Sequence, residues 1–401
     1  RGDLLGECDL IMSFLMYNDI SAMSRLHRSA SAQMSRPAIS IQKSGGWTFG
    51  SPSVLMMFYR APGELQSELQ EMDECMPHYY KITNGHGQGA ETIMRAEADF
   101  MRACFADAQI MLERAYAQID GNGQENMALC CDFLAWRLSL CTSFTPRESF
   151  EQRREALLQQ HNVAWLNILQ SSCAYYYALL GLPEKIPAVF REHQLASIHF
   201  LAPGKPMMEL IENQVYLAQG EYAKVIGHSE ALLGMCEAMH YALVALHIRL
   251  QTAAAYEMLG KRETADELLI SALAAAEPDA LYLPFVENYR YLKTALTRGA
   301  GAKFAAFVRT VTPLGEDFVR RCGEKRAEGS RPAALAGLTE RESAIAALVA
   351  KRLSNREIAE QLFLSEGSVK QYINQIYSKL LITGDVRTKR KRLAELAAPK
   401  S

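Results

Sequence analysis

The sequence has no long apolar run and no ordered pattern of cysteines. No stretch of 18 uncharged apolar residues occurs, and the longest apolar runs, at 174–182 and 343–350, are too short to span a bilayer, so no membrane partner is expected. The nine cysteines are odd in number and never spaced C-x-x-C, which argues against a disulfide framework and against a zinc ribbon. These absences predict a reducing, cytoplasmic compartment.

The chain also lacks the short motifs of common enzymes. The nine histidines form no H-E-x-x-H, and G-x-S-x-G is absent. The glycine-rich segment 84–89 superficially resembles a phosphate loop, but no strand precedes it and no Lys-Ser or Lys-Thr follows, so we favour a loop between repeats. We therefore expect no enzymatic activity, no metal and no cofactor.

Charge divides the 401 residues into two parts, although the formal net charge of the whole chain is only −2. Residues 331–401 contain 13 Lys and Arg against 7 Asp and Glu, whereas the preceding 330 residues contain 30 against 38. A basic end on an acidic body indicates a polyanionic partner for that end alone. Because 323–337 shows no apolar periodicity, we expect a domain at 1–322, a linker at 323–337 and a second domain at 338–401.

The acidic part is predicted to be an all-α stack of helical hairpins. Ala, Leu, Glu, Met and Arg dominate, and apolar residues recur at helical spacing. Small and aromatic residues fit a tetratricopeptide-like template, with turns at Ala103, Gly181, Gly220 and Gly260 and a further copy at 128–166. This spacing gives a period of about 39–40 residues rather than the usual 34. A non-repetitive helical bundle is the alternative.

The basic end contains the start signals of three short helices. Thr339 with Glu342, and Ser354 with Glu357, form capping boxes, and Ser365 is placed to cap a third helix that runs to about Leu380. Three short helices with abrupt turns predict a helix-turn-helix.

The third of these helices has two different faces. Val369, Ile373, Ile376 and Leu380 share a buried stripe, while the opposite side carries the long cation and the amides that can read base edges, namely Lys370, Gln371, Asn374 and, further along, Ser378. Ser365, Ser368 and the first backbone amides can meet a phosphate. The alternative is a solvated polar face on a small helical domain.

The basic end resembles the LuxR-type helix-turn-helix over some 60 residues. The resemblance is carried by LTERE at 338–342, LSNREIAEQLFLSEGSVK at 353–370 and IYSKL at 376–380. It implies double-stranded DNA as the partner, base reading by Lys370, Gln371 and Asn374, and backbone contacts from Ser368 and Lys379.

The LuxR-type resemblance also implies a fourth helix that pairs two copies on DNA. Asp385 or Thr388 would begin this helix, and Leu393 and Leu396 would form its apolar face. The basic run 389–392 could equally contact phosphates.

The helical body is similar to the sensor region of MalT-like LuxR regulators. The resemblance implies a bacterial-type transcription regulator whose body senses an unknown small-molecule or protein effector. We expect the effector to bind between about residues 90 and 300, near Tyr175 or Tyr176. The nucleotide-binding module of such regulators is absent and the first residue is Arg1, so we expect either a piece of a longer protein or a smaller relative. The alternative function is a helical-repeat adaptor with secondary, non-specific DNA contact.

Overall fold

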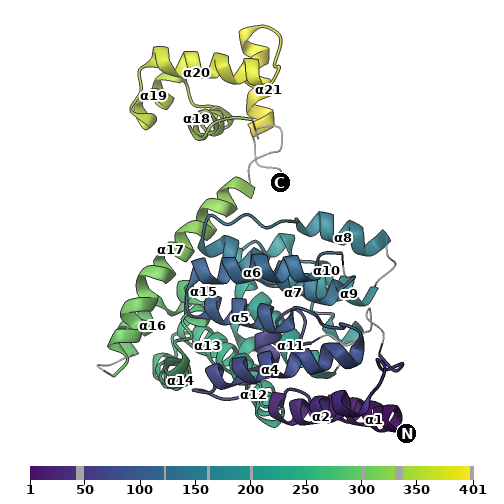
Figure 1. Ribbon diagram of the computed structural model, residues 1–401. Helices are drawn as coiled ribbons and strands as arrows, with labels where there is room; N and C mark the ends of the chain where they lie inside the picture. Colours follow the sequence, from purple (N-terminus) through teal and green to yellow (C-terminus); the bar gives the residue numbers. More distant parts are fainter. Residues whose placement is uncertain are drawn as a thin grey trace. The chain divides into compact units, whose positions relative to one another are not determined.

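Amphipathic segments rich in alanine and leucine fold into helices throughout, as predicted. The structure is a computed structural model that describes residues 1–41, 49–121, 123–159, 163–198, 202–299, 303–329 and 337–397 (Figure 1). Within these ranges every regular element is helical, which confirms the all-α prediction for them. None of the helices described there has both the length and the apolar character needed to cross a membrane.

The chain divides into two compact units, Arg1–Cys322, here called the body, and Gly323–Ser401, here called the tail unit. The first helices of the body are α1 (Gly2–Phe14), α2 (Ile20–Gln33), α3 (Val54–Phe58), α4 (Leu65–Thr83), α5 (Ala90–Met101), α6 (Phe105–Ile119) and α7 (Glu125–Cys141). They are followed by α8 (Phe150–Gln159), α9 (Val163–Leu180), α10 (Ala188–Arg191), α11 (Lys205–Gln219), α12 (Tyr222–Met239), α13 (Ala242–Met258), α14 (Arg262–Ala276), α15 (Leu283–Glu287), α16 (Tyr289–Gly299) and α17 (Ala305–Gly329). Single turns of 3-10 helix lie at Pro183–Lys185, Leu195–Ser197, Ala202–Gly204 and Glu277–Asp279.

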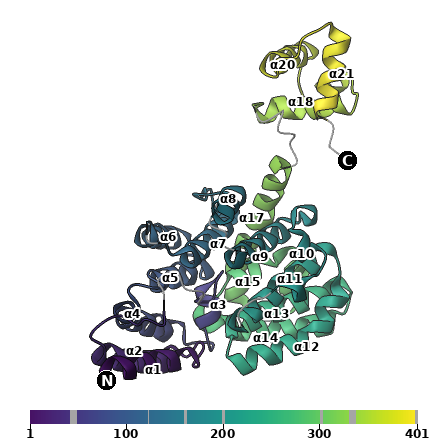
Figure 2. The same ribbon diagram turned by 90° about the vertical axis from the view of Figure 1, so that its right-hand side faces the viewer.

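Consecutive helices of the body pair side by side. Such pairs are α1 with α2, α5 with α6, α12 with α13, and α13 with α14 (Figure 2). The four turn positions that the repeat predicts are confirmed, since Ala103, Gly181, Gly220 and Gly260 have φ of 60°, 71°, 78° and 75°. A positive φ ends a helix and suits glycine, which has no Cβ to clash. The copy predicted at 128–166 coincides with α7 and α8, of which α8 packs against α9.

The earlier and later helices of the body meet through α3, α5 and α15. Helix α3 packs against α5 and α13, and α15 packs against α5. The backbone N–H of Ala242 donates to the carbonyl oxygen of Tyr59 at 3.1 Å, and that of Tyr282 donates to Met101 at 2.8 Å. These bonds join segments far apart in the sequence, so the body forms one continuous core.

A buried ion pair lies inside that core. The Arg137 guanidinium donates to both carboxylate oxygens of Glu287, with Nε–Oε1 and Nη2–Oε2 distances of 2.8 and 3.1 Å, and each side chain is only 1% exposed. The Tyr175 hydroxyl donates to the same carboxylate at 2.8 Å. The pair therefore connects α7, α9 and α15.

Helix α1 packs on α2 through one face and leaves an apolar stripe on the other. Gly6 and Leu10 are buried, and a Cβ on Gly6 would lie only 2.2 Å from Cγ of Met34. The outward side chains Leu4 and Leu15 are 70% and 59% exposed, and further exposed residues of this stripe are Leu5, Cys8, Ile11 and Met12. The stripe contains no charged residue.

The tail unit contains α18 (Glu340–Ala350), α19 (Asn355–Leu362), α20 (Glu366–Lys379) and α21 (Val386–Ala397). Its own core has at its centre the fully buried side chains of Ile345, Ile358, Val369, Ile376 and Leu393. The predicted linker, 323–337, begins inside α17, which continues to Gly329, while residues 330–336 lie outside the described ranges.

Candidate DNA-binding surface

Two reciprocal capping boxes start the first two helices of the tail unit, as predicted. The backbone N–H of Glu342 donates to Oγ1 of Thr339 at 3.3 Å, and that of Thr339 donates to Oε2 of Glu342 at 2.7 Å. Ser354 and Glu357 exchange the same pair of bonds at 3.3 and 2.6 Å. Because each box satisfies amides that lack a helical partner, α18 and α19 begin at defined residues.

Helix α20 follows a third cap and buries the predicted stripe. Ser365 accepts a hydrogen bond from the backbone N–H of Ser368 at 3.1 Å and so starts the helix. Val369, Ile373 and Ile376 are at most 4% exposed, and Leu380 is partly buried against the same core. Tyr377 is buried as well, which the sequence analysis did not foresee. The turn between α19 and α20 is thus held by packing on one side of α20.

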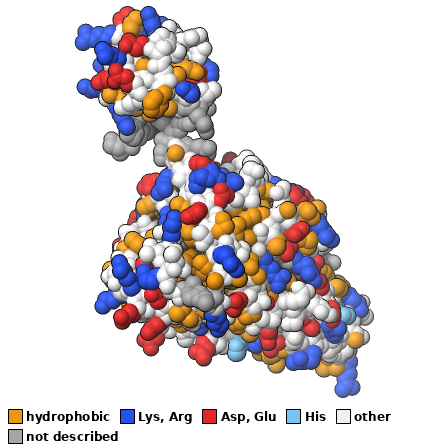
Figure 3. All heavy atoms as spheres, turned by 90° about the vertical axis from the view of Figure 1, so that its left-hand side faces the viewer, with side chains coloured by type: hydrophobic (Ala, Val, Ile, Leu, Met, Phe, Trp, Pro, Cys, Tyr) orange, Lys and Arg blue, Asp and Glu red, His pale blue; other side chains and the backbone are white. Residues whose placement is uncertain are grey.

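The opposite face of α20 is polar and open. Lys370, Gln371 and Asn374 are exposed, and their side chains make no hydrogen bond or ion pair within the part of the chain that the structure describes. Figure 3 shows lysine and arginine side chains around the edge of the tail unit in that view. The donors and acceptors of this face are therefore free to bind a partner.

Lys379 differs from these residues because it is already paired. Its Nζ lies 2.7 Å from Oε2 of Glu342, and its side chain remains 43% exposed. Although burial acts in the opposite direction, the bonds from Lys379 and Thr339 lower the pKa of Glu342. One carboxylate thus ties the start of α18 to the end of α20, a link that no sequence pattern showed.

The fourth helix begins at the first of its two predicted starts. The Asp385 carboxylate accepts from the backbone N–H of Thr388 at 2.9 Å, and α21 starts at Val386. Leu393 is fully buried and Leu396 partly buried in the core of the tail unit, where α21 packs against α18. Leu393 and Leu396 thus form the apolar face of α21, as expected, and this face is used inside the unit.

Part of the basic run 389–392 makes contacts inside the tail unit. Arg390 donates to Oδ1 of Asn355 at 2.7 Å and to the carbonyl oxygen of Leu353 at 2.6 Å, which fastens α21 to the turn before α19. Lys389 places its Nζ 5.9 Å from the ring centroid of Tyr377. Arg390 is thus a positioning residue that the sequence analysis missed, since nothing in the sequence pairs it with Asn355.

The two tyrosines proposed for the effector lie in different surroundings. Tyr175 is fully buried, its hydroxyl is held by Glu287, and the structure argues against a direct effector contact there. Tyr176 is partly buried, and its ring lies 5.4 and 5.5 Å from those of Phe150 and Tyr177. Burial raises the pKa of Tyr176. We interpret these ring contacts as packing between α8 and α9.

Comparison with known proteins agrees with the geometry of the tail unit. Residues 336–390 match the family described as bacterial regulatory proteins, luxR family. The chain is 41% identical over 63 residues to the transcriptional regulatory protein LnrK of Bacillus subtilis, which is 15% of this chain and 29% of that relative. It is 39% identical over 46 residues to the DNA-binding transcriptional activator DevR/DosR of Mycobacterium tuberculosis, 12% of this chain and 21% of the relative.

The matches cover less than a third of either curated relative. No solved structure matches the chain. Both relatives are transcription regulators by name. The tail unit contains a DNA-binding helix-turn-helix domain of the luxR family.

Proposed function

We propose that the chain is a cytoplasmic transcription regulator that places α20 in the major groove of a specific duplex. The observation that carries this proposal is the unpaired polar face of α20 within a luxR-family domain. Lys370 is suited to guanine O6 and N7, and the amides of Gln371 and Asn374 to adenine N6 and N7.

Phosphate contacts orient the helix on the duplex in this proposal. Ser365, Ser368 and the amides at the start of α20 lie where the helix dipole favours an anion. Lys379 contributes with the exposed part of its side chain, while its bond to Glu342 fixes its position.

Two copies bind DNA together, since a pair of half-sites is read by a two-fold dimer. Because Leu393 and Leu396 are used inside the tail unit, the pairing surface includes other apolar side chains. Leu381 and Val386 are 85% and 81% exposed where α20 gives way to α21. These two side chains are our candidates for the pairing surface.

The body acts as a MalT-like sensor built from tetratricopeptide-like hairpins. The paired helices and the left-handed turns at Ala103, Gly181, Gly220 and Gly260 support this assignment. Stacked hairpins present an extended inner surface on which an effector can bind. The effector is a small molecule or a protein, and its binding alters the affinity of the tail unit for DNA.

A gel-shift experiment with the full chain tests the DNA-binding part. The chain should bind a duplex selected from a random pool more tightly than random duplexes. Lys370→Ala should weaken binding to the selected duplex by roughly 5- to 150-fold and change random binding little. Lys351→Ala is the matched control, because Lys351 is exposed in the same unit but lies outside α20.

If both variants lose the same affinity for the selected and the random duplexes, Lys370 contributes only a general charge effect. If selection yields no preferred duplex and binding only follows salt concentration, the chain is the helical-repeat adaptor instead.

A further inference from the structure

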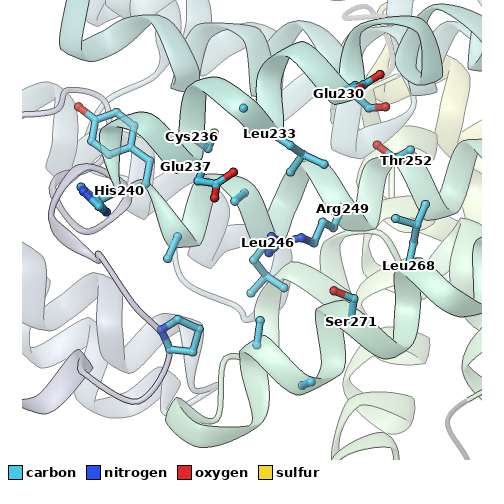
Figure 4. Close-up of a pocket in the computed structure, with 18 of the residues that line it drawn as sticks. Glu230, Leu233, Cys236, Glu237, His240, Leu246, Arg249, Thr252, Leu268 and Ser271 are labelled. Atoms are coloured by element: carbon cyan, nitrogen blue, oxygen red, sulfur yellow. The ribbon is translucent and has the colours of Figure 1, made fainter.

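An open groove runs along the inner side of three consecutive helices of the body. It has a volume of about 990 Å³ and lies between α12, α13 and α14 (Figure 4). Its floor is formed by α13, through Ala242, Ala245, Leu246, Arg249 and Thr252. Sites for small molecules have volumes of about 300–1,000 Å³, so the groove can take an elongated ligand.

The walls of the groove combine apolar, small and polar residues. Helix α12 contributes Leu233 and Gly234, and α14 contributes Leu268 and Ala275. A Cβ on Gly234 would meet no atom within 4 Å, so packing inside the body does not require glycine there. The Thr252 hydroxyl already donates to the Ile248 carbonyl oxygen at 2.7 Å. Thr252 is thus already bonded, whereas Thr264 and Ser271 of α14 add hydroxyl groups to the lining.

Arg249 is an exception on this floor. Its side chain is partly buried, and it makes no hydrogen bond or ion pair with any residue that the structure describes. Other partly buried arginines of the body are paired: Arg153 lies 2.6 Å from Asp132, and Arg298 lies 2.6 Å from Glu257. A guanidinium is costly to bury without a hydrogen-bond acceptor. The body provides a carboxylate for Arg153 and Arg298 but not for Arg249 among the described residues.

Figure 4 shows the Arg249 side chain lying in the groove with its nitrogen atoms toward Leu246. Glu230 and Glu237 are exposed on α12, and neither lies within ion-pair distance of Arg249. At the end of the groove Arg60 is paired with Asp19 at 3.1 Å. One unpaired cation between two outer carboxylates suits a ligand with a single negative group and disfavours a polyanion.

We propose that this groove binds an elongated apolar small molecule that carries one carboxylate. The carboxylate accepts two parallel hydrogen bonds from the guanidinium of Arg249, and the apolar chain lies along Leu233, Leu246 and Leu268. The proposal rests on the proposed function of the body as the sensor and names the class of its effector.

Calorimetry with the full chain and three ten-carbon probes tests the proposal. Decanoate, decanol and decylamine share one apolar chain and differ in the charge of the head group. Decanoate should bind about tenfold or more tightly than decanol, and decylamine should bind least. Arg249→Gln should lower decanoate affinity to that of decanol, and Arg249→Lys should give an intermediate value because it keeps the charge but not the fork.

Arg262→Gln is the matched control, because Arg262 is exposed on α14 and does not line the groove. This variant should bind decanoate as the original chain does. Equal binding of decanoate and decanol by the original chain overturns the proposal, as does unchanged decanoate binding by Arg249→Gln. Preference for an apolar peptide with a terminal carboxylate over decanoate assigns the groove to a protein partner and overturns it too.

The same preparations are assayed for specific DNA binding, which separates the two proposals. If DNA binding is specific and the decanoate preference is absent, only the groove assignment fails. When decanoate binds through Arg249 but no duplex is preferred, the groove assignment stands and the regulator proposal fails.

Discussion

The buried pair of Arg137 and Glu287 predicts a large and unequal response to mutation. Glu287→Gln removes the negative partner and leaves Arg137 charged at a position that is 1% exposed. Breaking a buried pair by removing one partner costs about 3–5 kcal/mol, because the remaining charge has lost both water and its counterion. We expect the free energy of unfolding of the body to fall by about that amount.

The aromatic side chains around the pair determine how much unfolding free energy each substitution costs. The Arg137 guanidinium carbon lies 4.9 Å and 5.2 Å from the ring centroids of Phe100 and Phe133, and these contacts survive in Glu287→Gln. Because these contacts still stabilise the charged guanidinium, we expect the loss of unfolding free energy to lie near the lower end of that range. Tyr175→Phe removes only one hydrogen bond to a charged acceptor and should cost about 1.5–3 kcal/mol.

The double variant Arg137→Met with Glu287→Leu removes both charges together. It should be more stable than Glu287→Gln alone, since no unpaired charge stays behind.

Tryptophan fluorescence during urea unfolding measures these changes in the full chain. All three tryptophans, at positions 47, 136 and 165, belong to the body, so the signal does not report on the tail unit. The midpoint and slope of the transition give the free energy of unfolding. A loss below about 1 kcal/mol for Glu287→Gln, or a double variant less stable than that single variant, would refute the reasoning.

Two further predictions concern pH and the start of α20. Burial, aided by the charge of Arg137, lowers the pKa of His247 to about 3, so below its ordinary value of 6.5 the unfolded chain takes up a proton that the folded body does not. Stability is thus lost as pH falls from 6.5 toward 3; His247→Leu should remove about 2 kcal/mol of the difference in unfolding free energy between about pH 7.5 and about pH 5, and an unchanged difference in urea unfolding would contradict this. Gly367→Ala should stabilise α20 by about 1 kcal/mol in hydrogen exchange, because the new Cβ meets only Ser365 Oγ at 3.8 Å. The same variant should bind specific DNA more weakly, since a methyl group separates the first amides from the phosphate, and unchanged affinity in gel shifts would place the phosphate elsewhere.

Local signals in the sequence were sufficient for the tail unit up to α20. The capping boxes at Thr339 and Ser354 involve residues three positions apart, and the stripe Val369, Ile373 and Ile376 follows from helical spacing alone. The four repeat turns were visible for the same reason. Each of these features depends on neighbours in the chain.

Features that depend on contacts between distant segments could not be predicted. Arg390 bonds to Asn355 across 35 positions, and Tyr175 meets Glu287 across 112. The apolar face of α21 was visible in the sequence, but its partner was not, and α18 rather than a second copy covers it. In the same way, the sequence does not show that Arg249 makes no ion pair with a carboxylate of the described residues.

The uncharged outer stripe of α1 has a consequence for how such proteins change over evolutionary time. Each hairpin of a stack contacts mainly its neighbours, so an outer face that carries Leu4, Ile11 and Leu15 but no charge can accept another hairpin without rearrangement elsewhere. Addition of a hairpin on this face would leave α12, α13 and α14 unaltered. The size of the array can therefore diverge among descendants while ligand preference is inherited unchanged.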